Sequence, residues 1–186
     1  MVVYFVTTNR EKFKVARQLL SQLGIKIKQI KRSYPEIQAE SLKEIVKFGL
    51  KKLSKTFQKE IMIEDSGLFI NALNGFPGAY SSYIQKTIGP KGILRLIKNI
   101  PERRAEFRSL VGYLGLNGKV SMFEGVIKGK ITTDVRGQRG SGYDFIFIPN
   151  GKTKTFAEMD FEEMIEFSDW KRSFTKFGQW YIERDK

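Results

Sequence analysis

The chain has 186 residues, of which 41% are hydrophobic and 13% aromatic, and its 33 Lys and Arg against 20 Asp and Glu give a formal net charge of +13. This length and composition fit one folded domain with a substantial core and exclude a disordered chain. The absence of Cys and His excludes disulfides, thiolate zinc sites and Ser-His or Cys-His catalysis, so any metal must have oxygen ligands, which favours Mg²⁺, Mn²⁺ or Ca²⁺.

Charge and hydropathy also restrict the partners and the location. The positive charge predicts a polyanionic partner, either a nucleic acid or a phosphorylated metabolite. The sequence has no long apolar run and no charged-then-apolar amino terminus, so we expect neither a membrane span nor a signal peptide. A chain without Cys fits a reducing compartment, and we expect a cytoplasmic protein.

The first half of the chain alternates between strand and helix patterns. Residues 2–6 and 25–30 predict strands, residues 12–23 predict an amphipathic helix, and Ser41-Leu42-Lys43-Glu44 has the form of a capping box for a helix over 42–55. Ile61, Met62 and Ile63 predict a buried strand that ends at two acids and turns at Gly67. This order is typical of the β-α-β units of an α/β fold.

The second half begins with two short helical patterns, over 78–87 and 91–98. Two long strand patterns, 105–116 and 119–133, then flank Asn117-Gly118, which is a strong hairpin signal. A glycine-rich loop over 136–142 leads into a strand over 145–148, and two helices are expected from about residues 160 and 168. We expect the hairpin to separate an amino-terminal β-α-β half from a carboxyl-terminal helical half, with a cleft between them.

The first candidate site joins the end of the first strand to the start of the first helix. Its residues are Thr7, Thr8, Asn9, Arg10, Glu11 and Lys12. Backbone amides at a helix N-terminus, with two hydroxyls and a lysine, form an anion-binding site. The alternative is ordinary N-capping of the helix by Thr8 or Asn9.

The second candidate site is a group of carboxylates. Glu36 lies on a loop, and Glu64 and Asp65 end a strand that we expect beside the first strand. If these acids converge, they form an all-oxygen site for Mg²⁺, which also takes substrate phosphates as ligands. The alternative is that the strand runs into a polar turn and both acids lie in water.

The third candidate site lies in the glycine-rich loop. Its residues are Gly140, Ser141, Gly142, Tyr143 and Asp144. The tyrosine ring could stack on a base and the carboxylate could accept hydrogen bonds from a base or ribose. The alternative is a glycine-rich turn with a core tyrosine.

Together these segments resemble the inosine-triphosphate pyrophosphatase family over nearly the whole chain and in the same order. The matching segments are Thr7-Thr8-Asn9-Arg10-Glu11-Lys12, Pro35-Glu36-Ile37-Gln38, Glu64-Asp65-Ser66-Gly67-Leu68 with Gly75-Phe76-Pro77-Gly78-Ala79-Tyr80, Gly142-Tyr143-Asp144 with the strand after it, and Thr155-Phe156-Ala157-Glu158-Met159. The Glu64-to-Tyr80 segments are the most specific.

The resemblance implies a single domain over 1–186, with a long twisted mixed β-sheet, flanking helices and two lobes around a central cleft. It implies a Mg²⁺-dependent hydrolase that splits non-standard purine nucleoside triphosphates (those of inosine, deoxyinosine and xanthosine) into monophosphate and diphosphate, usually as a homodimer. By the same resemblance, Glu36 and Asp65 bind the metal, Asp65 is the general base for water, and Ser66 contacts the substrate.

One segment departs from the family pattern. The family has Ser-His-Arg where this chain has Ser168-Asp169-Trp170, and a lysine where Met164 stands. A carboxylate accepts hydrogen bonds, so Asp169 would disfavour a 6-oxo purine unless protonated. Trp170 could stack on a base or pack in the core, and Lys171 or Arg172 could supply the missing donors. We therefore predict intact triphosphate machinery with altered or relaxed base selectivity.

Two other functions remain open from the sequence. A phosphatase that removes the terminal phosphate would release orthophosphate in place of diphosphate. A nucleic-acid-binding module, or a degenerate non-catalytic member of the fold, would use the basic residues between Arg10 and Arg32. The sequence does not favour nucleic-acid binding, because no aromatic stacking platform is interleaved with these basic residues.

Overall fold

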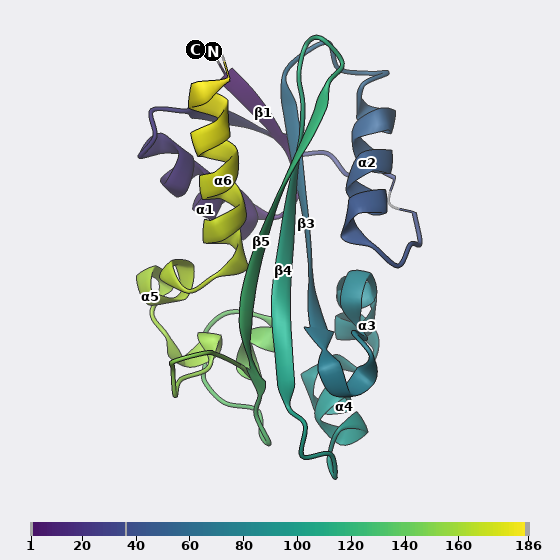
Figure 1. Ribbon diagram of the computed structural model, residues 1–186, viewed down its shortest axis with the longest axis vertical. Coiled ribbons are helices and arrows are strands. Elements are labelled where there is room, and N and C mark those ends of the chain that lie inside the picture. Colours follow the sequence, from purple (N-terminus) through teal and green to yellow (C-terminus); the bar gives the residue numbers. More distant parts are fainter. Residues whose placement is uncertain (1, 36, 185–186) are drawn as a thin grey trace. The chain divides into compact units, whose positions relative to one another are not determined.

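The computed structural model describes residues 2–35 and 37–184, and within them the chain forms a six-stranded mixed sheet of order β2-β1-β3-β4-β5-β6 (Figure 1). The strands are β1 (Val2–Val6), β2 (Lys26–Ile30), β3 (Ile61–Ile70), β4 (Arg104–Leu114), β5 (Val120–Ile131) and β6 (Phe147–Pro149). β1 runs parallel to both β2 and β3, and β5 and β6 are antiparallel. The expected mixed α/β sheet is therefore confirmed.

The chain divides into two compact units that the strands β3, β4 and β5 share. Unit 1 takes residues from the ranges 1–65, 109–125 and 170–186, and unit 2 takes 66–108 and 126–169. The expected split at the hairpin into amino-terminal and carboxyl-terminal halves is wrong. The last helix belongs to unit 1 because its Phe174 packs edge-on against Phe5 of β1, with ring centroids 5.8 Å apart.

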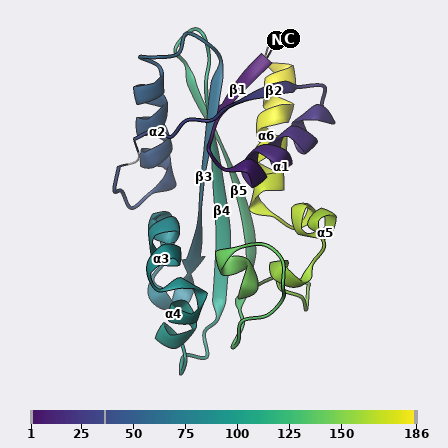
Figure 2. The ribbon, with the colours of Figure 1, turned by 180° about the vertical axis from the view of Figure 1, so that it is seen from behind.

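Three helices cover the strands of unit 1: α1 (Arg10–Ser21), α2 (Leu42–Leu53) and α6 (Asp169–Glu183). Figures 1 and 2 show α2 on one side of β3 and β4, and α1 and α6 on the other. Two glycines permit this packing, since a Cβ on Gly112 would lie 2.2 Å from Val46 of α2 and one on Gly178 would lie 2.4 Å from Leu23 beyond α1. A side chain at either position would force Val46 or Leu23 to move.

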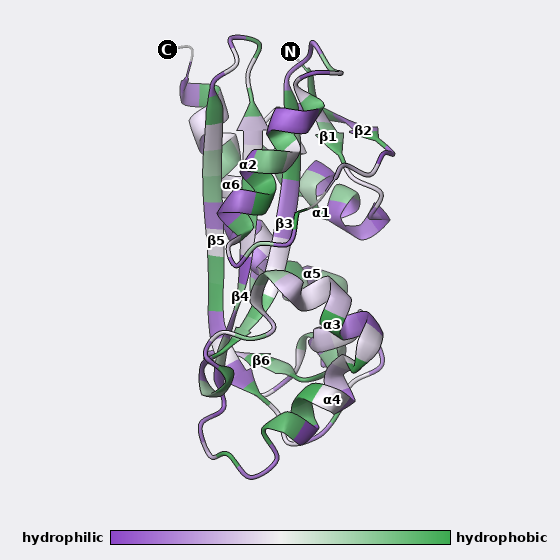
Figure 3. Cartoon of the chain, turned by 90° about the vertical axis from the view of Figure 1, so that its right-hand side faces the viewer, coloured by the Kyte–Doolittle hydropathy of each residue, from purple (hydrophilic) through white to green (hydrophobic). Residues whose placement is uncertain are grey.

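Unit 2 packs three short helices and four 3-10 turns around its own apolar core. They are α3 (Ser81–Thr87), α4 (Gly89–Leu96), α5 (Phe161–Glu166), η1 (Asn71–Leu73), η2 (Gly78–Tyr80), η3 (Gly142–Phe145) and η4 (Phe156–Glu158). In Figure 3 the strand β5 carries both hydrophobic and hydrophilic residues, and along its second half buried residues alternate with more exposed ones. Leu68, Ile70, Ile93 and Phe147 are among the fully buried members of the core.

Several expected elements are confirmed with small shifts at their ends. The first strand occupies Val2–Val6, Ser41 caps α2 by accepting from the Glu44 amide, and the hairpin turns at Gly118 with a φ of 76°. The later strand is shorter than expected and begins only at Phe147, because residues 142–145 form a 3-10 turn. Among the described residues, no helix is long and apolar enough to cross a bilayer.

The strand at Ile61 was expected to end at the two acids, and this expectation is wrong. β3 continues through Glu64 and Asp65 to Ile70. Gly67 is therefore a strand residue and not a turn. Its missing side chain serves close packing instead, since a Cβ there would lie 2.2 Å from the carbonyl oxygen of Gly78.

A partly buried polar cluster ties the end of α6 to the sheet in unit 1. Glu60 accepts hydrogen bonds from the hydroxyls of Tyr113 (2.7 Å) and Tyr181 (2.6 Å) and pairs with Arg184 (2.6 Å). Burial raises the pKa of Glu60, but the hydrogen bonds from Tyr181, Tyr113 and Arg184 outweigh burial and leave this pKa below its ordinary value. The cluster therefore stabilises the folded state while Glu60 is ionised.

We predict that Glu60→Gln lowers the free energy of unfolding at pH 7 by about 2–3 kcal/mol, because the change leaves Arg184 without its anion. The folded pKa of Glu60 lies below the unfolded one, so this contribution is complete above the unfolded pKa and is lost as the pH falls through the folded pKa. Urea unfolding at pH 7 and at pH 3 measures it. Equal losses at both pH values, or an equal loss in the exposed control Glu183→Gln, would contradict the prediction.

Candidate nucleotide and phosphate site

The turn between β1 and α1 is fixed by its own side chains. Asn9 caps α1, and its Oδ1 accepts from the amides of Glu11 (2.9 Å) and Lys12 (3.0 Å). Thr7 Oγ1 accepts from the Asn9 amide at 3.1 Å, and the Gln29 side chain donates to the Thr7 carbonyl at 3.0 Å. Of the two capping residues that the sequence allowed, the cap is Asn9.

Lys12 occupies an electrostatically unusual position in the first turn of α1. A cation at a helix N-terminus faces the positive end of the helix dipole. Its Nζ lies 2.8 Å from Oε2 of Glu64, whose side chain is 0% exposed while that of Lys12 is 18% exposed. The strand β3 thus supplies a buried anion that compensates Lys12. Thr8, Arg10 and Glu11 are exposed on the same turn, so the turn presents polar and charged groups to solvent.

The other oxygen of Glu64 is also engaged. Its Oε1 accepts a 2.8 Å hydrogen bond from Ser109 of β4, whose hydroxyl lies 2.8 Å from that of Ser173 in α6. The hydroxyls of Ser109 and Ser173 are buried. Neither serine could be singled out from the sequence, because 64 residues separate them and nothing in their neighbourhoods marks a site.

Asp65 directly follows Glu64 in β3. It is half-buried, as is Ser66, the next residue of β3. Glu36, the third acid of the expected cluster, lies outside the described residues. Within the residues that the structure describes, no three acidic side chains gather as a metal site. Metal binding by Glu36, Glu64 and Asp65 therefore stays a prediction.

The predicted base-binding residues of unit 2 form a compact capped turn. Ser141 and Asp144 make a reciprocal capping box at η3, and Asp144 Oδ2 accepts from the Ser141 amide at 2.8 Å. Gly142 has a φ of 56°, in the left-handed region that favours glycine. Tyr143 is 3% exposed and its hydroxyl donates to the Ser81 carbonyl at 3.2 Å, while burial raises its pKa. The ring thus packs in the core of unit 2.

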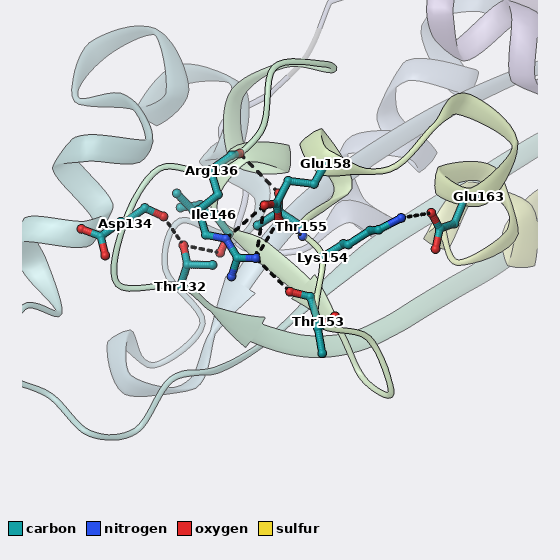
Figure 4. Close-up of polar contacts among 9 residues, drawn as sticks. All are labelled: Thr132, Asp134, Arg136, Ile146, Thr153, Lys154, Thr155, Glu158 and Glu163. Carbon is teal, nitrogen blue, oxygen red and sulfur yellow. Dashed lines mark hydrogen bonds and ion pairs between the residues drawn. The ribbon is translucent and has the colours of Figure 1, made fainter.

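A polar network holds the glycine-rich loop in place (Figure 4). Arg136 pairs with Glu158 at 3.0 Å and donates to the Thr153 carbonyl at 3.0 Å. Glu158 in turn accepts from the Thr155 amide at 2.7 Å, and this hydrogen bond is the main reason why the pKa of Glu158 is lowered. The capping-box spacing of three residues, from Thr155 to Glu158, is a sequence signal for this network.

The divergent residues Asp169 and Trp170 begin α6. Asp169 is 6% exposed and lies in the first turn, where the helix dipole favours a negative charge. Trp170 is half-buried. The final helix starts where the sequence predicted it to start, directly after Ser168.

These features define an α/β protein in which the turn between β1 and α1 places a lysine at the helix N-terminus. Helix N-termini of this kind are typical phosphate-binding sites. The model of the Ham1 family matches residues 3–180, and the chain belongs to this family.

Individual relatives agree with this assignment over nearly their whole length. The chain is 46% identical over 180 residues to the dITP/XTP pyrophosphatase of Pyrococcus horikoshii, and 44% identical over 181 residues to that of Methanopyrus kandleri; each alignment covers 97% of this chain and 96% of the relative. A HAM1 protein from Coxiella burnetii has a similar solved structure, with a TM-score of 0.86 and 25% identity over 98% of this chain and 99% of that one.

Proposed function

We propose that this protein hydrolyses nucleoside triphosphates of non-standard purines to the monophosphate and diphosphate. The observation that carries the proposal is the full-length identity of 44–46% to proteins named dITP/XTP pyrophosphatase. The geometry of unit 1 supports it. A lysine at a helix N-terminus is repelled by the positive end of the helix dipole, and a bound anionic substrate would offset this repulsion.

In this proposal the triphosphate binds at the β1–α1 turn. Lys12 is a cation whose buried partner, Glu64, keeps the ammonium group near the turn. Thr7, Thr8, Asn9, Arg10 and Glu11 line the same turn and surround the phosphates. Ser66 and the η3 residues Ser141, Gly142 and Asp144 are assigned to the nucleotide, together with the backbone of Tyr143, whose ring lies in the core of unit 2. Asp169 and Trp170 are assigned to the base.

We further propose that Mg²⁺ is the cofactor and that Asp65 and Glu36 hold it. The chain lacks Cys and His, and carboxylate oxygens are the ligands that Mg²⁺ prefers. Mg²⁺ usually takes only one or two carboxylates besides water and phosphate, so two acids suffice. Glu64 is less suited, because both of its oxygens already have partners. When bound, the metal would draw negative charge from the phosphates, and Asp65 would accept the proton of the attacking water.

We predict that Asp65→Asn lowers kcat by about 10²–10⁴-fold, because an amide cannot accept the water proton and is a poorer ligand for a cation. A diphosphate-release assay with Mg²⁺ measures this, and ion chromatography of the products distinguishes diphosphate from orthophosphate. The exposed acid Asp134 serves as a control, and Asp134→Asn is expected to retain activity. Release of orthophosphate would support a phosphatase instead, and undiminished turnover by Asp65→Asn would rule out its role as base.

The base preference is proposed to differ from that of a purine enzyme with a Ser-His-Arg motif. In the proposed pocket the buried Asp169 would offer an acceptor where a 6-oxo group needs a donor. We predict that the kcat/KM values for inosine and adenosine triphosphates lie within about 10-fold of each other. Asp169→Asn is expected to raise the kcat/KM for inosine triphosphate relative to that for adenosine triphosphate about 5- to 20-fold. The control is Glu166→Gln, which changes an exposed acid and is expected to leave this preference unchanged. A strong preference of the unchanged protein for inosine and xanthosine triphosphates would contradict altered selectivity.

We also propose that the protein is a homodimer. The α3–α4 segment of unit 2 exposes large apolar side chains, with Tyr83 67% exposed and Leu96 51% exposed. Apolar side chains gathered on one segment are the kind of surface that association covers. Sedimentation velocity is expected to give twice the mass of one chain, and Tyr83→Glu is expected to shift this toward the monomer. The control is Leu116→Glu at the hairpin tip, and a monomeric unchanged protein would refute the proposal.

Cytoplasmic location, which the sequence led us to expect, stays a prediction. Nucleic-acid binding is not part of this proposal. A steep loss of RNA or DNA binding with rising salt, together with an absence of turnover, would favour it.

A further inference from the structure

The ion pair of Lys12 and Glu64 is the outer end of a longer chain of polar contacts in unit 1. From the inside outward, Ser173 of α6 lies 2.8 Å from Ser109 of β4, Ser109 donates to Glu64 Oε1 at 2.8 Å, and Glu64 Oε2 lies 2.8 Å from Lys12 Nζ. We call Ser173, Ser109 and Glu64 the relay. It links three elements that are far apart in sequence to the first turn of α1.

The direction of the hydrogen bonds follows from the number of protons. A carboxylate only accepts, so the single hydroxyl proton of Ser109 goes to Glu64. Ser109 then has only lone pairs to offer Ser173, so a proton between the two hydroxyls comes from Ser173. The Ser173 hydroxyl also donates to the Trp170 carbonyl at 3.1 Å, and its single proton is shared between these two acceptors. The hydrogen bond from Ser109 to Glu64 is therefore the one whose direction is fixed.

The relay is costly as a purely structural feature. Ser109, Ser173 and the Glu64 side chain are 0% exposed, and the neighbouring contact between Phe5 and Phe174 is apolar. Burying a charge and two hydroxyls is often less stable than filling the same space with apolar groups. The one member of the group that reaches solvent is Lys12, at 18% exposure.

We propose that Ser109 and Ser173 are positioning residues that fix Glu64 and, through it, hold the Lys12 ammonium group ready for a polyphosphate. This inference rests on the proposed function, since it assigns Lys12 to the triphosphate. A lysine side chain has a flexible four-carbon stem. If its charged end is already held in place, less conformational entropy is lost when the polyphosphate binds. The relay acts on substrate binding and does not touch the substrate.

The test is steady-state kinetics together with calorimetric binding of inorganic tripolyphosphate in Mg²⁺ buffer, which needs no turnover. Ser109→Ala is expected to raise KM and the tripolyphosphate Kd about 5- to 20-fold with kcat changed less than about twofold, because ground-state and transition-state binding are lost together. Ser173→Ala changes the residue at the far end of the relay, and alanine is a good helix former that preserves α6. This variant is expected to raise KM and the tripolyphosphate Kd about two- to fourfold. Ser109→Thr keeps the hydroxyl and is expected to restore both values.

The matched control is Tyr113→Phe. It removes a buried hydroxyl from the same face of β4, four residues from Ser109, but this hydroxyl belongs to the Glu60 cluster. It is expected to leave KM and the tripolyphosphate Kd within about twofold, so an equal effect of Ser109→Ala and Tyr113→Phe would overturn the relay as a positioning device.

The two readouts separate this inference from the proposed function. If the protein hydrolyses triphosphates but KM and Kd do not respond to Ser109→Ala and Ser173→Ala, the relay is wrong and the function stands. If it hydrolyses none but binds tripolyphosphate with the expected response, the relay stands and the function is wrong. Failure to bind tripolyphosphate and to hydrolyse any triphosphate would overturn both.

Discussion

The ion pair between Lys12 and Glu64 is the constraint on which unit 1 depends. A lysine in the first turn of a helix opposes the helix dipole, and a carboxylate buried in a sheet is stable only with a partner. Each charge therefore requires the other, and the two meet because β1 pairs in parallel with β3, placing Phe5 opposite Met62. Without Glu64, the Lys12 charge would face the helix dipole without an anion. Without Lys12, the Glu64 charge would be buried without a cation.

Two polar clusters in unit 1 share one geometry but have different consequences. Glu60, the residue before β3, contacts Tyr113 of β4, and Glu64 of β3 contacts Ser109 of β4. A step of four residues forward along this part of the chain is therefore a step of four residues back along the neighbouring strand. Antiparallel neighbours produce this register. The Glu60 cluster fastens the end of α6 and is a matter of stability, whereas the Glu64 relay ends at the turn where a phosphate would bind.

Unit 2 solves a different problem, which is to hold a glycine-rich loop in one conformation. Its capping boxes at Ser141 and Thr155 and the pair of Arg136 with Glu158 supply the side-chain hydrogen bonds that such a loop lacks by itself. The buried hydroxyl of Tyr143, bonded to the Ser81 carbonyl, ties the loop to α3. A loop fixed in this way is suited to presenting polar groups to a ligand without a large entropic cost.

The sequence alone determined the features that depend on neighbouring residues: the mixed α/β pattern, the hairpin at Asn117-Gly118, the cap of α2 and the family. It failed where distant segments decide the outcome. β3 continues through Glu64 and Asp65, and the buried Glu64 has Lys12 and Ser109 as partners, both of them distant in sequence. Likewise, only the tertiary structure placed Ser173 beside Ser109, since a serine in an amphipathic helix carries no local sign of what it faces. Local propensity depends on residues that are close together in the sequence, whereas the compensation of a buried charge depends on residues that only the folded core brings together.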